Sequence, residues 1–168
     1  VFHPDFNKPA GQDVDLALLR MKHPRKGLNS FAIGTEKVFS GAGVSFLGWG
    51  YSGIGTTGRN YTDGELRMAT NRITSDSVKR LRIRFDDPRT EASDPLEGMP
   101  SLGDSGGPVL MSGAHGLSLV GIIVGQLKGV NFSEERQGEY GSIAVFERVA
   151  PYLQWLEQVI EVREGKKR

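Results

Sequence analysis

The segment Gly103-Asp104-Ser105-Gly106-Gly107-Pro108 holds a serine enclosed by glycines. Glycine adopts backbone conformations that other residues avoid, so this segment can bring the amide groups of Gly103 and Ser105 to one point outside the chain. Two such donors beside a serine hydroxyl would stabilise the oxyanion that forms when the hydroxyl attacks a carbonyl group. The pattern by itself is equally typical of an ordinary glycine-rich turn, so other parts of the sequence must decide between the two interpretations.

The composition is typical of one globular domain. The chain has 168 residues, and its 21 Lys and Arg against 20 Asp and Glu leave a net charge of +1. This length suffices for one hydrophobic core, and the charge balance argues against nucleic acid or an acidic membrane surface as a partner. There is no cysteine, which excludes thiol catalysis, disulfides and cysteine-based zinc sites. We expect no cofactor and no metal.

Short apolar stretches separated by glycines predict an all-β chain with one helix. The 23 glycines are spread along the chain, as in proteins with many strands and tight turns. Apolar runs and alternation predict strands over 14–21, 44–49, 65–73, 78–85, 108–111, 117–124 and 142–146. Arg80, Arg82 and Arg84 alternate with apolar residues, which indicates a solvated basic face. Apolar residues at helical spacing, with Pro151 in the first turn, predict a helix over 149–163.

Several passages, in order, resemble the chymotrypsin and trypsin family of serine proteases. Residues 103–108 look like the family's nucleophile motif, and Asp15-Leu16-Ala17-Leu18-Leu19-Arg20 resembles the segment that holds the triad aspartate. His3-Pro4-Asp5-Phe6-Asn7 resembles the stretch before it, while Phe46-Leu47-Gly48-Trp49-Gly50 and Val145-Phe146-Glu147-Arg148-Val149 resemble later strands. The resemblance covers nearly the whole chain. It implies an all-β fold of two antiparallel β-barrels, the first incomplete in this chain, with a C-terminal α-helix.

The resemblance implies a role for each residue of the motif. Ser105 would be the nucleophile, Asp15 would orient a histidine base, and the amides of Gly103 and Ser105 would form the oxyanion hole. Asp15 and Ser105 are 90 positions apart, close to the about 93 that separate aspartate and serine in the chymotrypsin template. Asp104 would form an ion pair with an amino terminus that is freed on activation of a zymogen.

None of the three histidines stands where the family has its base. The base lies about 45 residues before the aspartate, whereas His3 is only 12 residues before Asp15. We expect His3 to be structural and His23 and His115 to lie on the surface. Residues 1–168 are therefore predicted to be a protease domain that lacks its N-terminal segment. The catalytic histidine would come from that segment or from a second chain, and without it activity would fall by a factor on the order of 10⁶.

The resemblance also places a pocket for the substrate side chain. Its base would be Met99, six residues before the nucleophile, and its wall would be formed by Val124, Gly125 and Gln126, where the family often has Ser-Trp-Gly. Because Met99 carries no charge, the pocket is expected to accept a neutral or apolar side chain. Glu97 is close enough in sequence that a shift of the alignment would change this expectation.

Three functions are compatible with these patterns to different degrees. The leading one is a secreted or periplasmic serine endopeptidase that hydrolyses polypeptides through an acyl-enzyme on Ser105. Protein inhibitors would be further partners, and nucleic acid would not. No run approaches the ~20 apolar residues that span a bilayer. The second is an inactive protease homologue that acts as a binding or regulatory module. The third, an α/β-hydrolase, requires an acid and then a histidine after the serine, and no aspartate follows Ser105.

Overall fold

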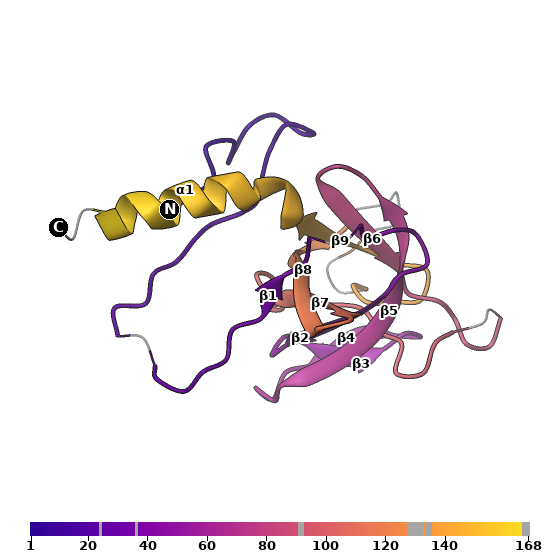
Figure 1. Ribbon diagram of the computed structural model, residues 1–168. Helices are drawn as coiled ribbons and strands as arrows, with labels where there is room; N and C mark the ends of the chain where they lie inside the picture. The colour runs from indigo at the N-terminus through magenta and orange to yellow at the C-terminus, as the bar shows by residue number, and fades with distance from the viewer. Residues whose placement is uncertain (24, 36, 91–92, 128–132, 134–135, 166–168) are drawn as a thin grey trace.

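The computed structural model of the chain is built from short strands and ends in one helix (Figure 1). It describes residues 1–23, 25–35, 37–90, 93–127, 133 and 136–165. The strands in these ranges are β1 (Ala32–Ile33), β2 (Gly43–Gly48), β3 (Ser52–Ile54), β4 (Gly58–Tyr61), β5 (Arg67–Asp76), β6 (Arg80–Arg84), β7 (Pro108–Gly113), β8 (Gly116–Gln126) and β9 (Ile143–Arg148).

Six antiparallel strands close on themselves into a barrel. They follow the order β2-β5-β6-β9-β8-β7, and β7 pairs again with β2. Closure leaves these strands without a free edge, which protects them from pairing with other chains. The short β1 adds to β8 in parallel, and β3 and β4 form a separate hairpin. The predicted antiparallel barrel followed by a C-terminal helix is confirmed.

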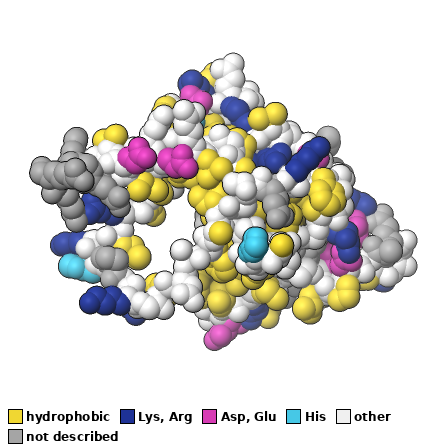
Figure 2. All heavy atoms as spheres, in the orientation of Figure 1, with side chains coloured by type: hydrophobic (Ala, Val, Ile, Leu, Met, Phe, Trp, Pro, Cys, Tyr) yellow, Lys and Arg dark blue, Asp and Glu magenta, His cyan; other side chains and the backbone are white. Residues whose placement is uncertain are grey.

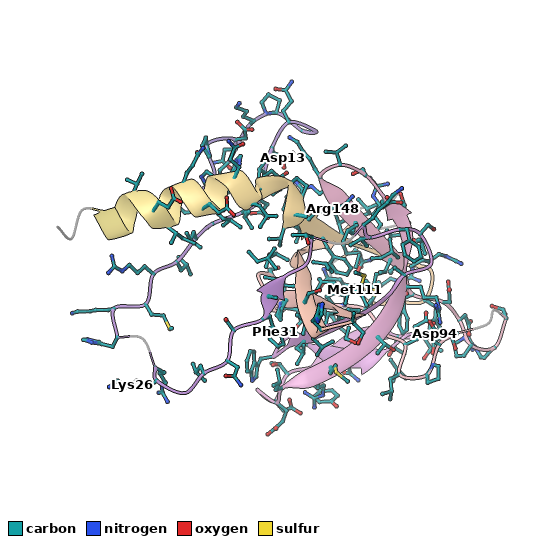
Figure 3. The ribbon with its side chains drawn as sticks, viewed as in Figure 1. Asp13, Lys26, Phe31, Asp94, Met111 and Arg148 are labelled. Atoms are coloured by element: carbon teal, nitrogen blue, oxygen red, sulfur yellow. The ribbon has the colours of Figure 1, made fainter. Side chains whose placement is uncertain are left out.

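Alternating side chains fill the interior of the barrel. Leu81 and Ile83 on β6 are completely buried, and the ring centroids of Phe46 and Phe146 lie 6.0 Å apart. Met111, labelled in Figure 3, is also buried. This core holds the ends of the strands in place, and the loops that leave those ends carry the candidate site. The buried residues of the core are Val38, Ala42, Val44, Phe46, Ile73, Leu81, Ile83, Val109, Met111, Val120, Ile123, Ala144 and Phe146.

The strand predicted over 14–21 is wrong. Only an isolated bridge between Phe2 and Ala17 forms here, and the side chain of Leu19 is 88% exposed. No described strand lies beside this stretch to accept its backbone hydrogen bonds, so the apolar run does not become a buried strand. The following segment bows away from the barrel (Figure 1) and carries several exposed basic side chains (Figure 2).

A second apolar cluster fastens the N-terminal residues to the terminal helix. Val14 and Leu16 pack with Tyr152, beside Ile122 and Trp155. Tyr152 belongs to a 3₁₀ turn, η1 (Ala150–Tyr152), which leads into α1 (Leu153–Gly165). The helix predicted over 149–163 thus corresponds to η1 and α1. In the described part of the chain no helix has the length and apolar character needed to cross a membrane.

Candidate active site

Ser105 lies in a tight loop just before β7. Gly103 and Gly106 have φ values of +94° and +83°, in the left-handed region that favours glycine. The amide of Gly106 donates a hydrogen bond to the carbonyl oxygen of Ile123 on β8 at 2.8 Å. The hydroxyl of Ser105 is exposed and donates to the carbonyl oxygen of Val124 at 3.4 Å. The loop is therefore fixed to β8, with the serine hydroxyl at its surface.

The amides of Gly103 and Ser105 are available to a ligand. Neither donates a hydrogen bond to any residue that the structure describes, and both residues are exposed. Backbone amides seek an acceptor, and a pair of unused donors beside a hydroxyl is suited to an anionic oxygen. This state of the two amides is compatible with the predicted oxyanion hole.

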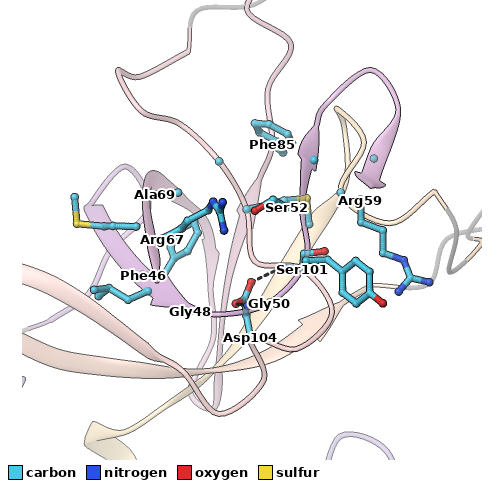
Figure 4. A pocket seen from close by; sticks show the side chains of 18 of the residues that line it. Phe46, Gly48, Gly50, Ser52, Arg59, Arg67, Ala69, Phe85, Ser101 and Asp104 are labelled. Carbon is cyan, nitrogen blue, oxygen red and sulfur yellow. Dashed lines mark hydrogen bonds between the residues drawn. The ribbon is translucent and has the colours of Figure 1, made fainter. Parts of the chain in front are cut away.

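Asp104 lines a cavity of about 310 Å³ (Figure 4). Its Oδ1 accepts a hydrogen bond from the amide of Gly50 at 2.7 Å, and its Oδ2 accepts one from the amide of Ser101 at 2.8 Å. The residue is half-buried, and no Lys or Arg in the described ranges forms an ion pair with it. Asp104 is thus held by two backbone amides and has no cationic partner within the described structure.

Asp15 and Ser105 open onto neighbouring cavities. Asp15 lines a cavity of about 360 Å³, and Ser105 lines one of about 420 Å³. Val124 and Arg80 contribute to the lining of both cavities. The structure therefore brings the two predicted triad residues, which are 90 positions apart in the sequence, to one region of the surface.

The cavity beside Ser105 contains three of the four predicted pocket residues. Val124, Gly125 and Gln126 line it. The side chain of Gln126 is held at both ends, because its Nε2 donates to the Ser142 hydroxyl at 2.9 Å and its Oε1 accepts from the Gly138 amide at 3.1 Å. These two hydrogen bonds thus fix the side chain of Gln126 in the wall of the cavity.

Met99 is the predicted pocket residue that does not line this cavity. It lines the Asp104 cavity instead and packs against the barrel core. An apolar side chain gains more from burial in the core than from a position in an open pocket, which accounts for this packing. The role of Met99 at the base of the substrate pocket stays a prediction. Glu97 lines the same cavity as Met99, and its carboxylate accepts hydrogen bonds from the amides of Asp86 and Asp94.

None of the three histidines lines the cavity of Ser105 or that of Asp15 in the described structure. The ring of His3 packs edge-on against Tyr152 and Trp155 at 5.0 and 4.9 Å, and burial lowers its pKa. His23 and His115 are exposed. We also find no cluster of metal-binding side chains among the described residues.

Glu147 is a buried charged residue that the sequence patterns did not single out. Its side chain on β9 is fully buried, and it accepts a hydrogen bond from the amide of Asp15 at 3.1 Å. Arg80, predicted to lie on a solvated face, forms ion pairs with both Glu147 and Asp13. The only signal in the sequence was a carboxylate directly after the apolar run 143–146.

Comparison with known proteins assigns the chain to a family. A search of curated proteins found no significant match to the chain. A family model described as Trypsin matches residues 1–156, which include the barrel, the Ser105 loop and the Asp15 segment. The chain therefore belongs to the trypsin family of serine-type peptidases.

Proposed function

We propose that this protein is a serine endopeptidase in which the Ser105 hydroxyl attacks the carbonyl carbon of a peptide bond. The observation that carries the proposal is the arrangement at the Ser105 loop. An exposed hydroxyl stands beside two amides, of Gly103 and Ser105, that donate to no described residue. Membership of the trypsin family supports a protease-like function for this arrangement.

The chemistry follows from what a serine hydroxyl needs. A histidine supplied from outside residues 1–168 takes the proton of Ser105 as the hydroxyl attacks, and Asp15 orients that histidine and stabilises its charged form. The negative charge that develops on the carbonyl oxygen is stabilised by the Gly103 and Ser105 amides. The amine leaves with the proton from the histidine, and water then releases the acyl group from Ser105. The cavities of Asp15 and Ser105 share Val124 and Arg80 in their linings, which supports a position of the imidazole ring between the two residues.

The test is covalent labelling of protein from its natural source with a fluorophosphonate probe. We expect one adduct, located at Ser105 by mass spectrometry, and we expect it to vanish in Ser105→Ala. The mass of the labelled species and its partners would identify the segment or second chain that carries the histidine. Folded natural protein that takes no label would overturn the proposal and favour an inactive homologue that acts as a binding or regulatory module.

Asp104 is proposed to control activity through an ion pair with a freed amino terminus. Support comes from its position at a cavity of about 310 Å³ and from the lack of a cationic partner in the described ranges. The amino group of Val1 is not the partner in this proposal, because it donates to the carbonyl oxygen of Leu18 at 2.7 Å. Asp104→Asn should fold but should react with the probe far more slowly.

The preferred substrate side chain is proposed to be neutral or apolar. The lining of the Ser105 cavity includes Pro100, Leu127 and Val145, and no Asp or Glu from the described residues. Arg59 also lines this cavity and would repel Lys or Arg. Cleavage of a peptide library should therefore disfavour Lys and Arg before the scissile bond. We further propose, from family membership alone, that the protein is secreted or periplasmic, which fractionation of the source cells would test.

A further inference from the structure

The buried carboxylate of Glu147 binds three donors from different parts of the chain. Its Oε2 accepts a hydrogen bond from the Asp15 amide at 3.1 Å. Its Oε1 accepts one from the Tyr152 hydroxyl at 3.0 Å. Arg80 Nη1 lies 2.5 Å from Oε2 and forms an ion pair without the alignment of a hydrogen bond. An ionised carboxylate is an acceptor only, so it is the group that suits three donors.

These contacts fix the backbone at Asp15 against the barrel and the C-terminal turn. Glu147 and Asp15 are 132 residues apart in sequence, so the hydrogen bond joins β9 directly to the N-terminal segment. On either side of Asp15, the side chains of Val14 and Leu16 are buried against Tyr152. The peptide unit of Asp15 is therefore held by one polar and two apolar contacts, while its own side chain remains exposed toward the cavity.

A carboxylate at this depth carries an energetic cost. Removing a charge from water disfavours its ionised form, and burial raises the pKa of Glu147 against the opposing effects of the Asp15 amide, Arg80 and Tyr152. A buried ion pair is often no more stabilising than apolar residues of similar volume. Stability alone therefore does not account for a carboxylate in this position, and its contact with Asp15 offers another reason.

We infer that Glu147 is a positioning residue, which holds the Asp15 backbone so that the Asp15 carboxylate meets the catalytic histidine. The inference rests on the proposed function, because it assigns Asp15 a partner. Glu147 acts through its hydrogen bond to the Asp15 amide and touches neither substrate nor histidine. Asp13 and Arg80 complete the charged surroundings, since Arg80 Nη2 donates to Asp13 Oδ2 at 3.0 Å.

The experiment compares four variants of the full natural protein with the wild type. Glu147→Leu removes the acceptor of the Asp15 amide. The double variant Arg80→Met with Glu147→Leu removes both buried charges, and it keeps the experiment decisive if Glu147→Leu does not fold. Glu147→Gln keeps one acceptor oxygen and serves as the conservative rescue. Tyr152→Phe is the matched control, because it removes a hydrogen bond from the same carboxylate and leaves the Asp15 amide paired.

Two readouts separate positioning from stability. Amide hydrogen exchange at residue 15, resolved by NMR, should become about tenfold faster in the two variants that lack the acceptor, and it should stay slow in Tyr152→Phe. In the same two variants kcat should fall about tenfold with KM for a peptide substrate little changed. The acid limb of kcat/KM against pH should move to lower pH, because a displaced Asp15 stabilises the imidazolium less. In Glu147→Gln, amide exchange at residue 15 should be slower, and kcat higher, than in Glu147→Leu.

The inference is overturned if the folded double variant retains slow exchange at residue 15 and a wild-type kcat. It is also overturned if Tyr152→Phe lowers kcat as much as Glu147→Leu does, since the effect would then be general destabilisation. If the wild type neither turns over peptide nor takes the fluorophosphonate label, the proposed function fails. Amide exchange at residue 15 still decides, in that case, whether Glu147 holds the Asp15 backbone.

Discussion

Replacing Gly48 by Ala should displace the Asp104 carboxylate and destabilise the Ser105 loop. A Cβ added at residue 48 would lie 1.9 Å from Asp104 Oδ1, 2.6 Å from its Cγ and 3.1 Å from its Cβ. The carboxylate cannot stay in place at such distances and would have to leave its hydrogen bonds of 2.7 and 2.8 Å to the Gly50 and Ser101 amides. Each hydrogen bond to a charged group contributes about 1.5–3 kcal/mol.

The magnitude follows from the half-buried position of Asp104. Water can replace part of what the carboxylate loses, so we expect a decrease of about 3 kcal/mol in the free energy of unfolding, the lower end of the summed range. The assay is urea unfolding followed by circular dichroism, with the same m value for both proteins. Gly43→Ala is the matched control, because Gly43 lies on the same strand and an added Cβ there meets nothing within 4 Å. If Gly48→Ala is as stable as Gly43→Ala to within about 0.5 kcal/mol, the expectation that the two hydrogen bonds of Asp104 stabilise the Ser105 loop is refuted.

Three further outcomes are expected. Ser105→Ala should lower kcat by a factor on the order of 10⁶ with little change in unfolding, which peptide hydrolysis by the full natural protein would check. Ile83→Ala, at a fully buried position, should cost about 2–5 kcal/mol of stability in thermal unfolding. Burial raises the pKa of Glu147 above its ordinary 4.5, so the folded protein binds this proton more tightly than the unfolded chain does. The wild type should therefore lose stability as pH rises through the interval between these two pKa values, and Glu147→Gln should lose less over the same pH series.

The strands of the barrel were predictable because each has a local signal. On β6, Leu81 and Ile83 alternate with arginines, and the structure buries both completely. The hairpin of β3 and β4 was not predicted, because its glycine-rich sequence is equally typical of a loop. The run 14–21 was predicted as a strand for its apolar composition, yet a strand also needs a neighbour, and composition does not show whether one is present.

The candidate site was predictable where backbone conformation depends on residue type. The glycines around Ser105 predicted a tight loop, and the structure has Gly103 and Gly106 in the left-handed region. The packing of Met99 on the barrel core could not be predicted, because counting along a chain does not show which way a side chain turns. Glu147 was missed because its role depends on a contact with Asp15, 132 residues away, and no local pattern reports such a contact.

The attachment of the N-terminal segment to the end of the chain has a consequence for biosynthesis. His3, Val14 and Leu16 pack against Tyr152 or Trp155, and Asp15 is bonded to Glu147. A ribosome makes the residues around Asp15 before these partners, and Glu147 lies 132 residues after Asp15. A nascent or truncated chain that ends before Tyr152 thus lacks contacts that hold the backbone at Asp15. Synthesis must therefore pass Tyr152 before these contacts can form around Asp15.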